Sequence, residues 1–247
     1  MAAKTNSKIR LYVTGRLGAG TDIPLEAGQA HYLRNVMRRQ VGDGLLLFNG
    51  RDGEWDAEIA SLEKHGGMAR GIALSRPQEE EPDLWLLFAP IKKARLDMIV
   101  EKATELGAAR LVPVLTRHTD VERVKEERLA AQVTEAAEQC ERLSVPDVAE
   151  PQKLEKVLEA WPKDRPLIFA DEAGGAPILP ALLGLGRKPA AILIGPEGGF
   201  AEEERRILTA LPFVMRVSLG PRILRAETAA LSLLALWQSA CGDWASP

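Results

Sequence analysis

Apolar positions follow two different patterns along the 247-residue chain, and the change falls near residue 80. Over residues 10–75 the apolar runs are short and are bounded by Gly, Asp and Asn, which is typical of strands joined by tight turns. We expect strands in RLYVTG, LLLFNG, EWDAEIA and MARGIALS, and one helix in EAGQAHYLRNVMRR. This part of the chain therefore predicts a small β-rich domain.

A stretch rich in proline and glutamate, SRPQEEEPD, follows at residues 75–83 and offers no apolar face. Such a composition is typical of a linker. We therefore expect a first domain over residues 1–75, a linker over residues 76–83 and a second domain over residues 84–247.

From Leu84 onward, short apolar strands alternate with amphipathic helices. We expect strands in LWLLFAP, ARLVPVL, PLIFADE, AAILIG and FVMRVSL. Helices are expected in KKARLDMIVEKATELG, from Glu122 to Leu143, from Pro151 to Trp161, in AEEERRILTAL, and from about Ala226 to Cys241. Strands that are apolar almost throughout are typical of burial on both faces, so the pattern predicts an α/β fold with a parallel sheet and flanking helices.

The composition fits an ordinary globular protein, with 46% hydrophobic and 27% charged residues. The start, MAAKTNSKIR, lacks the apolar stretch of a secretory signal. The apolar run from Ala229 to Trp237 is far shorter than the roughly 20 residues that span a bilayer. We therefore expect a cytoplasmic protein with no membrane partner.

Cysteine and histidine give no sign of a metal site or of a disulfide framework. The two cysteines, Cys140 and Cys241, lie far apart, and the three histidines, His31, His65 and His118, are scattered. No pair has the spacing of metal ligands, so we expect no metal.

The net charge of -3 argues against a protein covered in positive charge, the usual sign of a nucleic-acid-binding protein. The first 40 residues differ, because they carry seven basic and two acidic side chains, a local balance of +5. The basic ones are Lys4, Lys8, Arg10, Arg16, Arg34, Arg38 and Arg39, against Asp22 and Glu26. One end of the molecule is therefore suited to an anionic partner.

Three loops that follow strands of the second domain carry unusual sequences: ADEAGG, GPEGGF and SLGPRILRAETAA. Ligands of open α/β sheets bind beyond the carboxyl ends of the strands, so these loops should converge on one site. GPEGGF lacks the Lys and Ser/Thr of a phosphate-binding loop, and its own carboxylates oppose a phosphate. It is either a turn, with Gly198 or Gly199 at positive φ, or one wall of a pocket for a mostly neutral ligand.

The pair LIGPEGGF and SLGPRILRAETAALSLLAL resembles the signature of the SPOUT class of S-adenosylmethionine-dependent RNA methyltransferases. Within that class it is similar to the uracil-N3 methyltransferases of small-subunit (16S) ribosomal RNA. HYLRNVMRR, EKATELG, EQCER and LIFADE also match, in the family's order and over most of the chain. The resemblance implies a deep trefoil knot in the parallel α/β domain, S-adenosyl-L-methionine bound in the knot, a homodimer, and a PUA-like RNA-binding β-barrel at the N-terminus.

The resemblance also implies the residues of the cofactor site. One wall would comprise Ile194, Gly195, Gly198 and Gly199, the other Leu219, Gly220, Ile223 and Leu224, with Glu172 on the third loop. S-adenosylmethionine carries no phosphate, which agrees with glycine loops that have no basic phosphate clamp. Glycine lets the backbone approach an adenine closely.

Methyl transfer to uracil N3 requires loss of a weakly acidic imide proton, whose pKa is comparable in order to that of a tyrosine, about 10. Glu197 is a candidate for the base that takes it, although Glu197 could instead only order its loop, and Glu227 competes for the role. Arg225 could hold the uracil carbonyls and stabilise the developing negative charge. Its alternatives are a phosphate contact or an ion pair with a glutamate.

Arg10, His31, Arg34, Arg38 and Arg39 are the candidates for RNA contacts. On a helix, Arg34 and Arg38 would share one face with His31, although basic residues at this spacing are often only solvated. Two other functions remain open: ribose 2′-O-methylation by the same fold class, and RNA binding without catalysis. EKATELGAARLVPV and the intact Gly-Pro loops favour the base methyltransferase.

Overall fold

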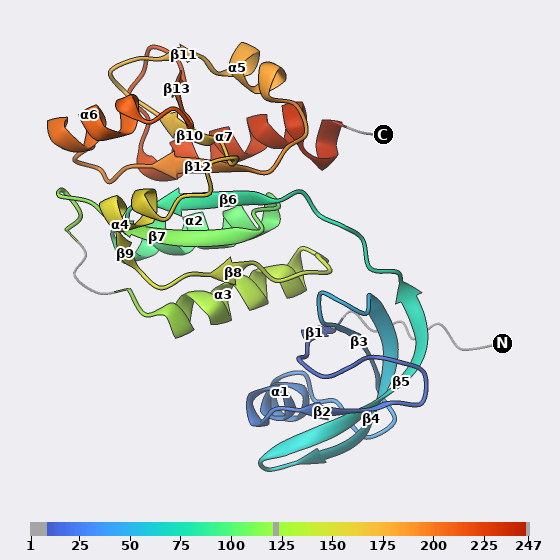
Figure 1. Ribbon diagram of the computed structural model, residues 1–247. Helices are drawn as coiled ribbons and strands as arrows, with labels where there is room; N and C mark the ends of the chain where they lie inside the picture. The colour runs from blue at the N-terminus through green and yellow to red at the C-terminus, as the bar shows by residue number, and fades with distance from the viewer. Residues whose placement is uncertain (1–8, 121–123, 246–247) are drawn as a thin grey trace. The chain divides into compact units, whose positions relative to one another are not determined.

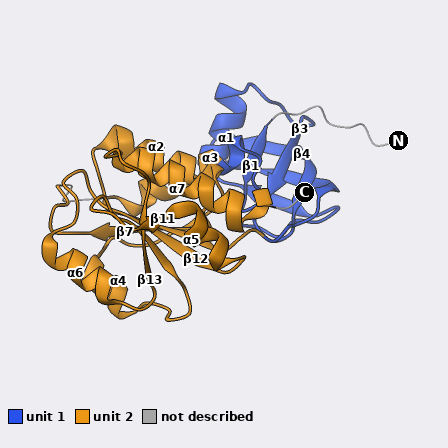
Figure 2. Cartoon of the chain, turned by 90° about the horizontal axis from the view of Figure 1, so that it is seen from above, with its two compact units in different colours: residues 1–80, 137–145 blue, residues 81–136, 146–247 orange. Residues whose placement is uncertain are grey.

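The computed structural model describes residues 9–120 and 124–245. The described residues form two compact units, one within residues 1–80 and 137–145 and the other within residues 81–136 and 146–247, coloured separately in Figure 2. Lys4 and Lys8, which contribute to the basic N-terminal segment, lie outside the described residues.

The first unit is a five-stranded sheet with the strand order β1-β3-β4-β5-β2. Its strands are β1 (Arg10–Tyr12), β2 (Asp22–Leu25), β3 (Gly44–Phe48), β4 (Glu54–Glu63) and β5 (Gly66–Arg76). Strands β1 and β3 are parallel, and the other pairs are antiparallel. All four predicted strands are confirmed, and β2 is an additional one.

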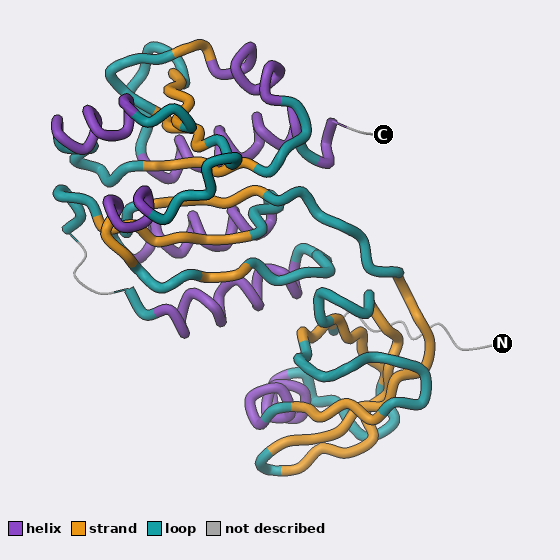
Figure 3. Tube along the Cα trace, in the orientation of Figure 1, coloured by secondary structure: helices purple, strands orange, loops and turns teal. Residues whose placement is uncertain are grey.

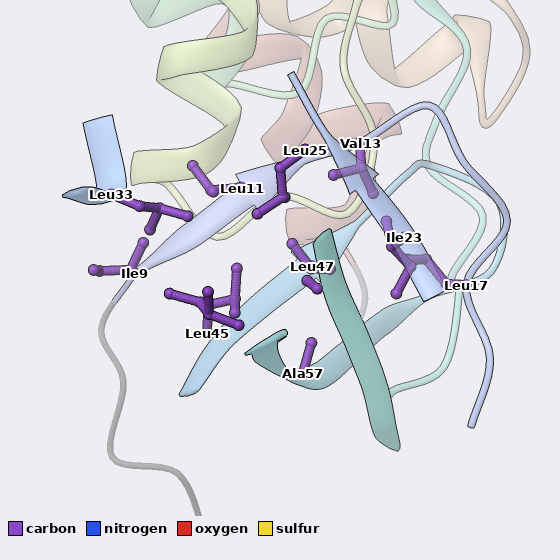
Figure 4. Packing of buried hydrophobic residues seen from close by; sticks show 12 residues of the cluster. Ile9, Leu11, Val13, Leu17, Ile23, Leu25, Leu33, Leu45, Leu47 and Ala57 are labelled. Atoms are coloured by element: carbon purple, nitrogen blue, oxygen red, sulfur yellow. The ribbon is translucent and has the colours of Figure 1, made fainter. Parts of the chain in front are cut away.

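Alternate residues of these strands point into one apolar core, shown in Figure 4. Leu11, Leu45 and Leu47 are almost fully buried there, because side chains in a strand alternate between its two faces. Leu33 closes the core from the short helical segment formed by α1 (Ala27–His31) and a π-helical turn (Tyr32–Val36).

The second unit is built around an eight-stranded sheet in which every pair is parallel, as predicted. The order is β11-β13-β10-β12-β6-β7-β8, with β9 paired to β7. The strands are β6 (Leu84–Phe88), β7 (Arg110–Leu115), β8 (Asp147–Val148), β9 (Gln152–Lys153), β10 (Leu167–Ala170), β11 (Ala176–Pro177), β12 (Ala190–Ile194) and β13 (Val214–Ser218). Figure 1 shows the middle strands side by side, and all five residues of β12 are buried.

Helices cover both faces of this sheet. They are α2 (Lys93–Glu105), α3 (Glu126–Gln139), α4 (Leu154–Glu159), α5 (Ile178–Leu185), α6 (Glu202–Ala210) and α7 (Ala226–Cys241), and Figure 3 shows their distribution along the chain. Helices α2, α5 and α7 lie on one side of the strands, and α4 and α6 lie on the other (Figure 2). The predicted helix from Glu122 begins within residues 121–123, outside the described residues, and α5 was not predicted.

Candidate active site

One cavity of about 590 Å³ opens at the carboxyl ends of β10, β12 and β13. The three loops that the sequence singles out converge there. The lining includes Ala170 to Gly174, Ile194 to Glu197, Gly199, Phe200 and Ser218 to Ala226, together with Arg95, Arg205 and Ala229. Its volume lies within the range of roughly 300 to 1,000 Å³ that is usual for small-molecule sites.

The loop after β12 turns sharply at Gly199, whose N–H donates to the Pro196 carbonyl at 2.9 Å. Gly199 has φ +68°, in the left-handed region, and an added Cβ would lie 2.8 Å from Glu172 Oε1. A side chain at this position would therefore be strained and would also displace Glu172. The loop is a tight turn and, at the same time, a wall of the cavity.

A second loop, after β7, supports this turn from outside the cavity. His118 Nδ1 lies 3.2 Å from the Gly198 carbonyl and 3.1 Å from the Gly199 carbonyl, so this nitrogen must carry the hydrogen. The backbone N–H groups of Arg117 and Ala201 each donate to the buried Glu204 carboxylate at 2.9 Å. Glu204 thus caps α6 and joins the two loops.

The loop after β10 is fixed by Asp171, which is buried. Its carboxylate accepts a hydrogen bond from Arg216 Nε of β13 at 2.5 Å and forms an ion pair with Arg205 Nη2 of α6 at 3.0 Å. Charge-assisted bonds of this kind are shorter and stronger than neutral ones. Asp171 therefore ties together the elements that carry two walls of the cavity.

Charged side chains gather where α2 meets the cavity. Arg95 Nη1 lies 3.4 Å from Glu197 Oε1, and Arg95 Nε lies 3.6 Å from Glu227 Oε1. Arg225 stands at the N-cap of α7, with an exposed side chain on the cavity wall. No described residue forms an ion pair with Arg225.

The cavity brings together nearly all of the residues expected there. Its lining includes Glu172, Ile194, Gly195, Glu197, Gly199, Leu219, Gly220, Ile223, Leu224 and Arg225. Gly198 is the exception, because it faces His118 instead of the cavity. Asp171, Arg95 and Arg205 were not anticipated.

In the first unit, Arg34, Arg38 and Arg39 line a second hollow of about 380 Å³. They do so without the regular helix that the sequence predicts, because a π-helical turn ends at Val36 and Arg38 has φ +53°. His31 is exposed, with its Nδ1 2.9 Å from the Asn35 side-chain nitrogen. The hollow groups three arginines, and His31 does not line it.

The structure corrects the prediction for Arg10, which is buried. Its Nε donates to Glu54 Oε2 at 2.5 Å, and its Nη atoms donate to the carbonyls of Ala137, Glu138 and Arg142 at 2.9 to 3.1 Å. Every nitrogen of the guanidinium therefore has an acceptor inside the protein. Arg10 stabilises the fold and is not available to a phosphate.

Within residues 9–120 and 124–245, no helix is long and apolar enough to cross a membrane. The same residues contain no group of three or more His, Cys, Asp or Glu side chains that could hold a metal ion.

Two family models match the chain. One, described as an RNA methyltransferase domain, matches residues 78–238 and includes every residue of the cavity. The other, described as an RNA methyltransferase PUA domain, matches residues 25–66 and includes the hollow with the three arginines.

Individual relatives agree with both models. The chain is 34% identical to ribosomal RNA small subunit methyltransferase E of Rickettsia conorii, over 92% of this chain and 93% of the relative. The solved structure of that methyltransferase from Neisseria gonorrhoeae, bound to S-adenosyl methionine, has 28% identity and a TM-score of 0.83, and covers 96% and 99% of the two chains. A Legionella pneumophila methyltransferase with bound SAM gives 30% identity and a TM-score of 0.83, covering 95% and 98%.

Proposed function

Because the chain belongs to the ribosomal RNA small subunit methyltransferase E family, we propose that it methylates N3 of a uracil in small-subunit ribosomal RNA. The cofactor is S-adenosylmethionine. The observation that carries the proposal is the cavity lined by the two Gly-Pro loops, with Glu197 and Arg225 on its wall.

The residues of the cavity fit this cofactor. Ile194, Leu219 and Leu224 offer apolar contacts, and the tight turn at Gly199 lets the backbone come close to a flat ring. Asp171 already pairs with Arg205, and the glycine loop lacks the Lys and Ser/Thr of a phosphate-binding loop, which agrees with a cofactor that carries no phosphate. We assign the cofactor to Glu172, Ile194, Gly195, Gly199, Leu219, Gly220, Ile223 and Leu224.

When bound, S-adenosylmethionine supplies a methyl group that leaves its sulfur for the uracil nitrogen. The chain's own residues prepare that nitrogen, because the protonated imide has no suitable lone pair. Glu197, which lines the cavity with 39% of its side chain exposed, accepts the N3 proton. Arg225 faces the negative charge that then spreads over the uracil carbonyls.

We extend the proposal to the trefoil knot, the oligomeric state, the domain boundaries, the RNA-binding residues and the location of the protein. Strand β12 lies between β10 and β6, and α7 returns to pack on α2 and β12, which supports a chain threaded into a trefoil knot. We propose a homodimer, a PUA-like RNA-binding domain over residues 1–75, a linker over 76–83 and a SPOUT domain over 84–247. Arg34, Arg38, Arg39 and His31 remain the RNA-binding candidates, and the cytoplasm, where ribosomal RNA is, remains the proposed location.

The decisive experiment is mass spectrometry of ribosomal RNA from a strain that lacks this protein, with and without the gene restored. We expect one 3-methyluridine to disappear from small-subunit RNA and to return with the gene. Persistence of every 3-methyluridine would contradict the proposal, and loss of a 2′-O-methylated ribose instead would favour the other activity of this fold class. Calorimetry with S-adenosylmethionine tests both enzymatic functions at once, because a non-catalytic RNA-binding protein need not bind it.

A further inference from the structure

Arg95 occupies a special position beside the cavity. It belongs to the first turn of α2, which follows β6, and β6 is the neighbour of β12 on the side away from β10. Its guanidinium lines the cavity between the carboxylates of Glu197, at 3.4 Å, and Glu227, at 3.6 Å. One cation therefore connects the two glutamates that compete for the role of base.

Helix stability does not explain an arginine at this place. The first turn of a helix carries the positive end of the helix dipole, which favours acidic side chains and disfavours basic ones. The start of α2 nevertheless has Lys92, Lys93 and Arg95 and no acidic residue in its first turn. Lys92 and Lys93 are exposed to solvent, whereas Arg95 is half-buried at the cavity. The place of Arg95 is therefore better explained by its contact with the cavity than by the stability of α2.

The environment of Glu227 suits a residue that holds Arg95 in place. Its side chain is only 13% exposed, and its Oε2 is buried without a hydrogen-bond partner among the described residues. Glu227 does not line the cavity, whereas Glu197 does. A base must reach the proton that it takes, so Glu197 has the access that Glu227 lacks.

We propose that Arg95 is a further catalytic residue of the transfer site and that Glu227 positions it; this rests on the function proposed above. The Arg95 guanidinium donates to a carbonyl oxygen of the uracil, while Glu197 accepts the proton from N3. The negative charge left on the imide spreads over N3 and the two carbonyl oxygens, where Arg95 and Arg225 both stabilise it. Glu227 holds Nε of Arg95 from the buried side, while Nη1 faces Glu197 at 3.4 Å, so that the end of the guanidinium lies beside the proposed base.

The test uses the full-length protein, substrate ribosomal RNA and saturating S-adenosylmethionine, and it measures the single-turnover rate at uracil N3. Arg95→Ala should lower the rate about 100- to 1,000-fold, the usual cost of losing one preorganised donor. Its dissociation constant for S-adenosylmethionine, measured by calorimetry, should change less than about threefold, a free-energy change well below 1.4 kcal/mol. Lys93→Ala, which removes an exposed cation from the same helical turn, is the matched control and should keep the wild-type rate.

Glu227 variants test the positioning role. Glu227→Gln keeps an oxygen that can accept from Arg95 Nε, so it should retain at least about a tenth of the wild-type rate, whereas Glu227→Ala should lose most of it. Glu227→Ala should have no additional effect in the Arg95→Ala background, because both changes remove one interaction. Thermal unfolding of each variant confirms that it is folded before its rate is interpreted.

Three results would overturn the proposal. A folded Arg95→Ala protein with the wild-type rate would remove Arg95 from the transfer site. A loss of cofactor affinity as large as the loss of rate would assign Arg95 to S-adenosylmethionine. A Glu227→Gln protein as inactive as Arg95→Ala would make Glu227 the base. Failure of the wild-type protein to methylate uracil N3 would instead contradict the proposed function, so the two hypotheses are tested separately.

Discussion

Two adjacent glycines in the loop after β12 differ in how well they would tolerate a side chain. Gly199 has φ +68° and faces Glu172, whereas Gly198 leaves 3.4 Å between an added Cβ and the His118 side chain. The conformation at Gly199 costs a residue with a Cβ about 1 to 2 kcal/mol, before any displacement of Glu172.

Gly199→Ala should therefore weaken S-adenosylmethionine binding at least about tenfold, because 1.4 kcal/mol corresponds to a factor of ten. Gly198→Ala is the matched control, and we expect less than about a threefold change. Calorimetry with S-adenosylmethionine measures both. Equal effects of the two substitutions would show that the loop tolerates a side chain at either position.

The backbone of Arg225 takes part in the start of α7, whereas its side chain is exposed. Its carbonyl accepts from the Ala229 N–H at 2.9 Å and so begins α7, whichever side chain it carries. Arg225→Ala should abolish methylation of ribosomal RNA while largely sparing the affinity for S-adenosylmethionine. Rate and affinity are measured on the same preparation, and an equal loss of both would place Arg225 in the cofactor pocket.

At the residue scale, the sequence could identify those site residues that lie within a local motif. Glu197 and Arg225 lie within the two Gly-Pro loops, and the structure puts both on the cavity wall. Asp171 could not be found in this way, because its partners Arg205 and Arg216 lie 34 and 45 positions away. Arg10 was predicted to be an exposed cation for the same reason, because its partner Glu54 is 44 positions away in the sequence.

At the scale of elements, the loop after β7 and the loop after β12 act as one support for the cavity. His118→Ala removes the donor to the Gly198 and Gly199 carbonyls. A hydrogen bond contributes about 0.5 to 1.5 kcal/mol net, so affinity for S-adenosylmethionine should fall about two- to tenfold. His118→Asn keeps an N–H near the position of Nδ1 and should restore most of the affinity. An unchanged affinity in the alanine variant would show that the turn holds without His118.

Helices and strands could be predicted where apolar residues recur at a regular spacing. Helix α7 spans Ala226–Cys241, as its sequence predicts. Strand β2 was missed because it has four residues and contains Pro24, and an edge position in the sheet is where a strand tolerates proline. Helix α5 was missed because Pro180 and Gly184 interrupt it, and both residues disfavour a helix interior.

At the scale of the whole molecule, a buried ionic network stabilises the first unit. Glu54 accepts from Arg10 and, through both oxygens, from Arg76 at 2.9 Å. Burial raises the pKa of Glu54, but the hydrogen bonds from Arg76 and Arg10 outweigh burial and hold that pKa below its usual value of 4.5. The network therefore contributes stability above pH 4.5, and this contribution is lost as the pH falls through the lower pKa of the folded state.

Glu54→Gln should lower the free energy of unfolding at neutral pH by about 3 to 5 kcal/mol, because it leaves two arginines without their carboxylate. The wild-type protein should lose stability as the pH falls below 4.5, and the variant should lose less over the same range. Urea unfolding followed by circular dichroism measures both. Parallel pH profiles for the two proteins would show that Glu54 is not the group responsible.

RNA binding should depend on salt through the hollow in the first unit. Arg34→Ala combined with Arg38→Ala should reduce the slope of log affinity against log salt by about 1 to 2, because each phosphate contact contributes roughly 0.7 to 0.9. Arg70→Ala is the control, since Arg70 is exposed in the same unit but pairs with Asp22. An equal slope for the double variant and the control would exclude the hollow from RNA contact.

The carbonyls that surround Arg10 have a consequence for the order of events during protein synthesis. The last strand of the first unit ends at Arg76, but the Arg142 carbonyl that Arg10 requires is translated 66 residues later. At usual elongation rates, that interval lasts roughly 3 to 13 s. Until the middle of the chain has left the ribosome, the nascent N-terminal sheet therefore lacks three of the four acceptors that hold Arg10 in the folded protein.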